Sequence, residues 1–382
     1  MDTPQLSADS FLLPSGTPNP HLVKQRLHDW LLLARDGVAE NTFRAYASDW
    51  RQFQDWCQFG ETIEGTSVAD RSSAIDPDLI IAYIKSHLGL VSPATLRRRL
   101  STLSKIIGIA GLVSPFTDEL VKQAMQLIGR GYRKTPSRPG QMPSLYEQKL
   151  AQLHRLGLSN ADLHHNEAGK QRQAAGLTWS HVLKVKAALP IEGHQWVQRK
   201  HARARALIHL AYDSMCRISE IARMNIDDLS FREQGDALVV LGQRKDNQEG
   251  EEEYAYLAAD TVIELKQWLH LADVQSGPLF CAFTRNGRQI QTTDLGVQKR
   301  MLERNLHEIY KFVAKAIAVD PTLFSCHSTR VGSTQDMLEE NIGMLAVKQA
   351  GRWKSDRMPS RYGKKIEATK GGMAQLAMKK GR

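Results

Sequence analysis

The sequence has few cysteines, and none of them are paired. Cys57, Cys216, Cys281 and Cys326 lie far apart in a chain of 382 residues and form no CxxC motif. Closely spaced cysteines are typical of structural zinc sites and of disulfide frameworks, so neither is predicted. Isolated thiols fit a reducing compartment, and we expect the protein in the cytoplasm.

Long apolar runs are also missing. No stretch is long enough to cross a bilayer, and residues 1–4 lack the basic flank and apolar run of a signal peptide. We therefore expect an intracellular protein with no membrane partner. Residues 1–20 are rich in proline, serine and threonine without an apolar period, which predicts a disordered arm.

Positive charge is present in excess. The chain has 51 lysines and arginines against 41 acidic residues, a net charge of +10 and a pI near 9.4. This balance favours a polyanionic partner such as nucleic acid, although many basic proteins bind no anion. Because 382 residues exceed what one hydrophobic core usually serves, we expect two domains and a linker.

Helical patterning dominates residues 21–130. Aromatic residues recur at spacings of three and four over residues 40–59, and helix starts are signalled at Asp76-Pro77, at Ser92-Pro93 and near residues 117–119. These signals predict a compact helical bundle. Its basic face at residues 97–99 is either solvated or inserted in a DNA groove.

Residues 131–176 lose this pattern and predict a linker. Its adjacent His164 and His165 could suggest a metal site. However, neighbouring residues point in different directions and no third ligand follows at a suitable spacing, so no metal is predicted.

Residues 177–382 predict a second domain. Thr178 caps one helix, a second ends near Ser214, and a short helical turn covers residues 215–222. Apolar runs at 237–241 and 253–257 predict two paired strands joined by a polar loop that carries Lys245. Further helices are predicted over residues 259–271, 293–318, 329–340, 343–350 and 369–380. The predicted fold class is therefore mostly α, an N-terminal helical bundle plus a mixed α domain with a small antiparallel β-sheet.

Short polar islands in this second domain share one possible chemistry. Breaking and rejoining a nucleic-acid strand without metal requires positively charged groups that stabilise the phosphate in the transition state. It also requires an activated nucleophile and a proton for the leaving oxygen. Arg217 and Arg330 each have a polar partner three residues away, Glu220 and His327, and guanidinium groups bind phosphate oxygens in pairs. Taken alone, a His327–Arg330 pair is more often a surface or capping pair.

A nucleophile and a proton donor can be named in the same region. A tyrosine with a pKa near 10 needs a proton acceptor, and His327 could accept that proton. Lys245 could give a proton to a departing deoxyribose oxygen. Trp353 could donate its indole N–H to the phosphate, although an isolated tryptophan is more often a core residue.

Five short motifs follow one another in this domain: residues 217–223, residues 242–245, residues 327–332, residues 349–353 and Arg361-Tyr362, with Tyr362 nine residues after Trp353. Their order and spacing resemble the tyrosine recombinase, or phage integrase, family, and most closely its Cre-type site-specific recombinases. The resemblance also covers residues 41–57 and 95–100, whereas the linker is longer than in Cre-type proteins.

The resemblance implies a role for each matched residue. Tyr362 would form a 3′-phosphotyrosyl bond, His327 would be the base and Lys245 the general acid. Arg217, Arg330 and Trp353 would bind the phosphate, and Glu220 would orient its neighbours. The implied DNA contacts are Arg44, Thr95, Arg98, Lys299 and Arg300.

The implied activity is site-specific DNA recombination at inverted-repeat sites. A homodimer would bind one site and a homotetramer would pair two sites and pass through a Holliday junction, with no metal or other cofactor, on the nucleoid of a bacterial host cell. Residues 372–380 resemble the helix that such proteins insert into a neighbouring subunit, although they also fit a surface helix. Alternatives are a telomere resolvase, a type IB topoisomerase-like enzyme and a catalytically silent DNA-binding regulator.

Overall fold

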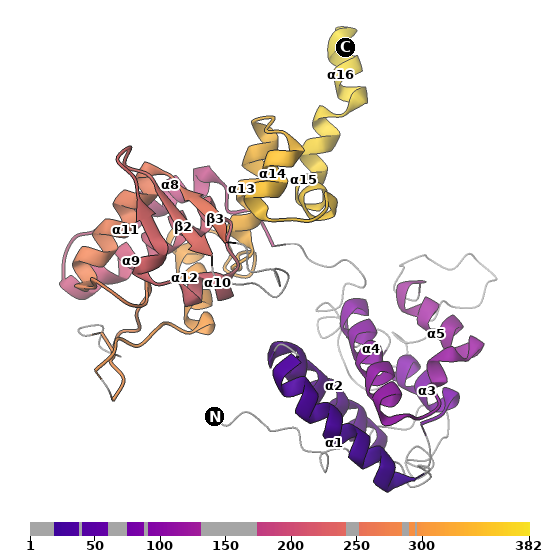
Figure 1. The fold of residues 1–382 in the computed structure, drawn as a ribbon. Helices are drawn as coiled ribbons and strands as arrows, with labels where there is room; N and C mark the ends of the chain where they lie inside the picture. Colours follow the sequence, from indigo (N-terminus) through magenta and orange to yellow (C-terminus); the bar gives the residue numbers. More distant parts are fainter. Residues whose placement is uncertain are drawn as a thin grey trace, which may run out of the picture. The chain divides into compact units, whose positions relative to one another are not determined.

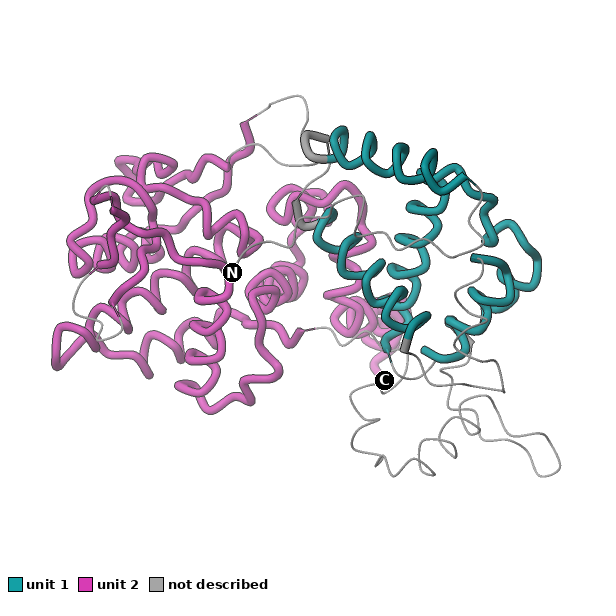
Figure 2. The backbone as a smooth tube through the Cα atoms, turned by 90° about the horizontal axis from the view of Figure 1, so that it is seen from below, with its two compact units in different colours: residues 1–172 teal, residues 173–382 magenta. Residues whose placement is uncertain are grey.

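The computed structural model describes residues 19–37, 40–59, 75–87, 91–130, 174–241, 252–284, 290–294 and 296–382. The backbone forms two compact units, unit 1 at residues 1–172 and unit 2 at residues 173–382 (Figure 2). Lys245, His164 and His165 lie outside the described residues, as does almost all of the predicted arm and linker. The predicted domain boundaries, 21–130 and 177–382, stay predictions.

Unit 1 is helical, and its helices begin where the sequence signals them. Asp76 Oδ1 accepts a hydrogen bond from the Leu79 amide at 2.8 Å, and Ser92 Oγ accepts one from the Thr95 amide at 3.1 Å. These caps satisfy donors that the first helical turn leaves unpaired, which confirms both predicted starts. The helices are α1 (Pro20–Gly37), α2 (Glu40–Phe59), α3 (Pro77–His87), α4 (Pro93–Ala110) and α5 (Glu119–Arg130).

Each helix of unit 1 turns an apolar face to a shared core. Leu96, Leu100 and Leu103 of α4 are fully buried, and Phe53 of α2 meets Tyr83 of α3 edge-on with ring centroids 5.2 Å apart. Helices α1 and α2 both pack on α4, and α3 packs on α5 (Figure 1). A fully buried leucine contributes about 1.5–3 kcal/mol, so packing rather than helix propensity stabilises this bundle.

Unit 2 combines helices with one small sheet. Strands β1 (Leu229–Phe231), β2 (Ala237–Leu241) and β3 (Glu253–Leu257) pair antiparallel in that order, with Val239 opposite both Leu229 and Ala255. The predicted fold class is confirmed. The helices are α8 (Trp179–Ala188), α9 (Gln195–Ser214), α10 (Ile218–Arg223), α11 (Ala259–Ala272), α12 (Glu303–Ala316), α13 (Ser328–Glu339), α14 (Met344–Gly351), α15 (Arg357–Lys370) and α16 (Gly372–Lys379).

Helix α9 is the central helix of this unit. Residues Ala206, Leu207, Ile208 and Leu210 are fully buried, and α8, α11, α12, α13 and β3 all pack against the helix (Figure 1). Because α9 is fixed on so many sides, the position of its C-terminal end is fixed too. The candidate site is built at that end.

The structure differs from the predictions at one expected helix and at one helix that was not expected. The described residues between 281 and 300 form a bridged hairpin, with Cys281 opposite Arg300, and α12 begins only at Glu303, so the predicted helix over 293–318 starts too early. A tight turn explains the difference, since Gly296 has a φ of 74° and its amide donates to the Thr293 carbonyl at 2.9 Å. Helix α15 was not predicted. Within the described ranges, none of the helices has the length and apolar character to cross a membrane.

Candidate active site

Arg217 lies where α9 gives way to α10. Met215 has a left-handed backbone with a φ of 48°, which ends α9, and Arg217 becomes the N-terminal cap of α10. The Arg217 amide donates to Glu220 at 2.8 Å, and Arg217 Nη1 donates to the same carboxylate at 3.1 Å. The predicted pairing of Arg217 with Glu220 is therefore present as a cap. The Arg217 side chain is still 42% exposed, so part of its guanidinium faces solvent.

Arg330 comes from α13 and is almost fully buried. Its Nη2 donates to the Gly351 carbonyl at 3.0 Å, and its Nη1 donates to the Met215 carbonyl. Carbonyl groups hold this guanidinium without neutralising it. Burial, followed by the charges of Arg352 and Arg217, lowers the pKa of Arg330 to about 10, so the group is still charged at neutral pH. A buried, charged arginine with only neutral acceptors favours an anion beside it.

The position of α13 depends on a close backbone approach at Gly332. A Cβ at this residue would lie 2.0 Å from the carbonyl oxygen of Leu177. The segment before α8 therefore runs directly against α13, where the Leu177 amide donates to the Ser328 carbonyl at 2.7 Å. Only glycine allows this contact. It fixes α13, and with it Arg330, against the segment before α8.

Trp353 and Tyr362 complete the cluster. The guanidinium carbon of Arg330 lies 5.1 Å from the centre of the Trp353 ring, and the Trp353 and Tyr362 ring centroids are 5.9 Å apart at 69°. A Cβ at Gly351 would lie 2.0 Å from the indole, so glycine is needed for the ring to sit there. The structure thus brings together Arg330, Trp353 and Tyr362, three of the predicted residues.

The pKa shifts of Tyr362 and His327 both favour the neutral form of the side chain. Burial raises the pKa of Tyr362, and Arg330, Arg361 and Arg217 act in the opposite direction. His327 is an exposed residue, and partial desolvation, then the charges of Arg330 and Arg217, lower its pKa. At neutral pH the phenol keeps its proton and the imidazole is free to accept one.

Arg352 is a part of this cluster to which the sequence pattern assigned no role. Its side chain is 7% exposed, and its Nη2 donates to Glu220 Oε2 at 2.9 Å while its Nη1 donates to the Ser214 carbonyl at 2.9 Å. Its backbone has a φ of 55°, a left-handed conformation that is costly for a residue with a Cβ. These contacts join residues more than a hundred positions apart, so no local signal could have revealed them.

A cavity of about 560 Å³ opens beside the cluster. Arg217, Arg352 and Trp353 line it together with Lys348, and Glu253 is its acidic member. The cavity is thus a largely cationic space next to a buried phenol, which suits a phosphodiester. In the described part of the chain, no group of three or more His, Cys, Asp or Glu side chains is arranged to hold a metal ion.

The residues implied as DNA contacts have varied surroundings. Arg98 forms an ion pair with the buried Asp49, and Thr95 hydrogen-bonds Ser92 Oγ at 2.8 Å. Arg300 donates to the Met224 carbonyl at 2.8 Å and to Asn225 at 2.6 Å. Arg98 and Arg300 therefore also hold neighbouring elements together. Arg44 and Lys299 have exposed side chains, and all five DNA-contact assignments stay predictions.

Comparisons with known proteins are consistent with this geometry. Residues 188–368 match the model of the phage integrase family. The chain is 28% identical to an integrase/recombinase XerD homologue of Selenomonas ruminantium over 333 residues, covering 85% of this chain and 81% of that protein. It is also 28% identical to the recombinase Cre of Escherichia phage P1 over 179 residues, covering 45% of this chain and 52% of Cre. The likeness to Cre therefore covers less than half of the chain.

A likeness to solved structures extends to the fold. A crystal structure of the XerH site-specific recombinase bound to palindromic difH substrate superposes with a TM-score of 0.51 at 13% identity. The match covers 93% of this chain and 88% of that one. At this identity the likeness supports the fold only.

Proposed function

We propose that Tyr362 is the nucleophile that attacks a DNA phosphate, because residues 188–368 match the phage integrase family and the chain is a site-specific tyrosine recombinase. The phenol oxygen forms a bond to phosphorus, the bond from phosphorus to the 5′ oxygen breaks, and a 3′-phosphotyrosyl link results. The observation that carries this proposal is the contact of Trp353 with both Arg330 and Tyr362 beside a cationic cavity.

The proton balance follows from the neighbouring groups. The phenolic proton passes to the neutral imidazole of His327, whose pKa is lowered by partial desolvation and by the two arginines. The leaving 5′ oxygen takes a proton from Lys245, the acid of the predicted hairpin loop. Rejoining reverses both transfers, so the link keeps the energy of the broken bond and no ATP is consumed.

Two arginines would stabilise the charge of the five-coordinate phosphate. Arg330 is held from behind by carbonyl groups, and Arg217 is held by Glu220 with part of its guanidinium open. Guanidinium groups bind nonbridging oxygens in pairs and remain charged through the reaction. They supply the positive charge that a divalent metal would otherwise provide, so we expect cleavage to need no metal.

The substrate and assembly are proposed on the same basis. We expect double-stranded DNA with an inverted-repeat site, a dimer on each site, and a tetramer that exchanges strands through a Holliday junction, as in Cre-type recombinases. Helix α16 exposes Met373, Leu376 and Met378 at 66%, 44% and 78%. Exposed apolar side chains of this kind suit insertion into a neighbouring subunit.

Covalent trapping with a nicked duplex tests the proposed chemistry. The wild-type chain should form a DNA-linked species that survives denaturation, and Tyr362→Phe should not. Tyr256→Phe, which removes the hydroxyl of a strand β3 tyrosine that does not line the cavity, is the matched control and should still form it. A binder without catalysis would form no link in any variant. Hairpin products would favour a telomere resolvase, and relaxation of supercoils without exchange would favour a topoisomerase.

A further inference from the structure

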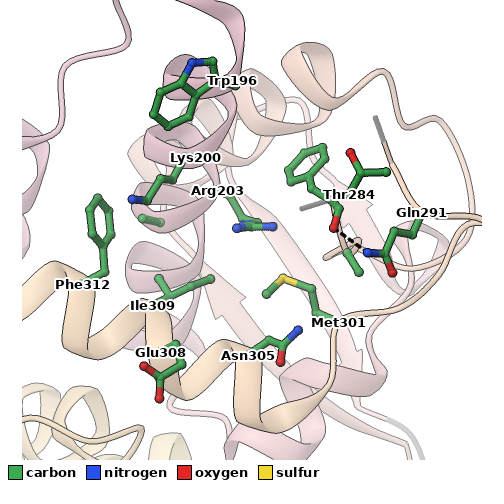
Figure 3. A pocket seen from close by; sticks show the side chains of 13 residues that line it. Trp196, Lys200, Arg203, Thr284, Gln291, Met301, Asn305, Glu308, Ile309 and Phe312 are labelled. Atoms are coloured by element: carbon green, nitrogen blue, oxygen red, sulfur yellow. Dashed lines mark hydrogen bonds between the residues drawn. The ribbon is translucent and has the colours of Figure 1, made fainter. Parts of the chain in front are cut away.

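A second cavity in unit 2 has a volume of about 720 Å³ and lies between the first half of α9, the hairpin at residues 281–300 and α12 (Figure 3). None of the residues proposed for catalysis lines it. Cavities of this size commonly hold a ligand or part of one. Its notable lining residues are Trp196, Lys200, Arg203, Phe283, Gln291 and Phe312.

Arg203 extends from α9 into this cavity (Figure 3). Burial lowers its pKa to about 10, so the guanidinium is charged at neutral pH. Its Nε is buried without a hydrogen-bond partner, and its Nη1 makes one long contact, 3.4 Å, with the Cys281 carbonyl. No carboxylate of the described residues forms an ion pair with it. Arg203 is therefore a partly buried cation that has no counter-charge among the described residues.

Arg205, two residues further along α9, shows how this fold pairs a buried arginine when the purpose is structural. Its Nε and Nη2 donate to the two oxygens of Glu264 at 2.7 and 2.5 Å. A neutral side chain could fill the position of Arg203 without the cost of an unpaired charge. Folding alone therefore does not explain Arg203, and an anion from outside the chain does.

The surroundings of Arg203 add a second cation and aromatic walls. The Lys200 Nζ lies 4.0 Å from the centre of the Phe312 ring, and the Arg203 guanidinium carbon lies 5.0 Å from the centre of the Phe283 ring. Trp196 at the edge is 48% exposed. Glu308, the acidic lining residue, is hydrogen-bonded to Lys311 at 2.8 Å and so does not neutralise Arg203.

We propose that this cavity binds a backbone phosphate of the target DNA through Arg203, with Lys200 as the second cation. The inference rests on the proposed function, and it adds a contact that the sequence pattern did not assign. Guanidinium donors match phosphate oxygens in geometry and charge. The hairpin wall also carries the exposed Lys299, whose amide donates to the Gln291 carbonyl at 2.6 Å and whose carbonyl accepts from the Ala282 amide at 2.8 Å. A predicted DNA contact is thus part of the same hairpin.

The test uses the full-length chain, a duplex selected from a random DNA pool, and binding measured over a range of salt concentrations. Loss of one phosphate contact lowers the slope of log K against log salt by about 1 and weakens binding to all sequences alike. Arg203→Met should show this change, with affinity reduced about tenfold or more. Lys184→Met removes one exposed lysine from α8 and should leave the slope unchanged.

A stability measurement separates this role from a structural one. Methionine fills the same space without a charge, so Arg203→Met should melt at the same or a higher temperature than the wild type. An unchanged salt slope would overturn the proposal. The proposal would also be overturned if a nucleoside monophosphate or polyglutamate bound saturably to the wild type but not to Arg203→Met, while the salt slope of DNA binding was the same in both proteins. If the wild type binds DNA but forms no covalent link, the proposed function fails, and the slope still decides the role of Arg203.

Discussion

Replacing Arg352 separates the stability of the fold from the geometry of the site. Arg352→Ala and Arg352→Gly both remove the bonds to Glu220 and to the Ser214 carbonyl, each 2.9 Å long. A hydrogen bond from a charged donor contributes about 1.5–3 kcal/mol. Both variants should therefore have a lower free energy of unfolding than the wild type.

The two variants differ in backbone strain. The φ of 55° at this position strains alanine but not glycine. Arg352→Gly should consequently be more stable than Arg352→Ala by about 1 kcal/mol. Urea denaturation followed by fluorescence measures this difference.

Cleavage should not follow that order. Without Arg352, Glu220 loses a fixed partner, and the guanidinium of Arg217 that it holds can shift. A displacement of about 1 Å in a catalytic group can reduce a rate about a hundredfold. Single-turnover cleavage of saturating DNA should therefore be slowed to a similar extent in both variants. Activity that ranks with stability, or wild-type rates in both variants, would refute this reasoning.

Three further outcomes are expected. Gly351→Ala places a Cβ about where the Trp353 ring lies, so the ring must move away from Arg330 and Tyr362, and cleavage should fall while circular dichroism stays unchanged. The pKa of His327 is lowered, so its imidazole stays neutral at pH values below the ordinary histidine pKa of about 6.5. The cleavage rate should therefore begin to fall only below that pH, and this fall should change in His327→Gln. A fall that begins above about pH 6.5 contradicts the role of His327 as base. Cleavage should continue in excess chelator because Arg217 and Arg330 carry the charge, and inhibition that Mg²⁺ reverses would disprove this.

Local signals in the sequence were sufficient for much of the fold. The starts of α3 and α4 follow from Asp76-Pro77 and Ser92-Pro93, and strands β2 and β3 follow from two short apolar runs. Each depends on the residues next to it. Helix α12 was placed too early because the turn at Gly296 interrupts a sequence that otherwise suits a helix.

The candidate site was predictable where residue type and order carry the chemistry. Arg330, Trp353 and Tyr362 are in contact as a cluster, and Arg217 is bonded to Glu220. Arg352 and Arg203 could not be identified in this way. Arg352 matters because it hydrogen-bonds Glu220, a residue far away in the sequence. Arg203 matters because it is desolvated without a counter-charge among the described residues, and the sequence does not show which arginines are desolvated.

The identity of the nucleophile is tested most directly by locating the covalent link. The DNA adduct of the wild-type chain is trapped on a nicked duplex, digested with nuclease and protease, and mapped by tandem mass spectrometry. The expected result is a nucleotide attached through phosphate to the Tyr362 oxygen, and no adduct from Tyr362→Phe. An adduct on another residue, or one that persists in Tyr362→Phe, would contradict the account.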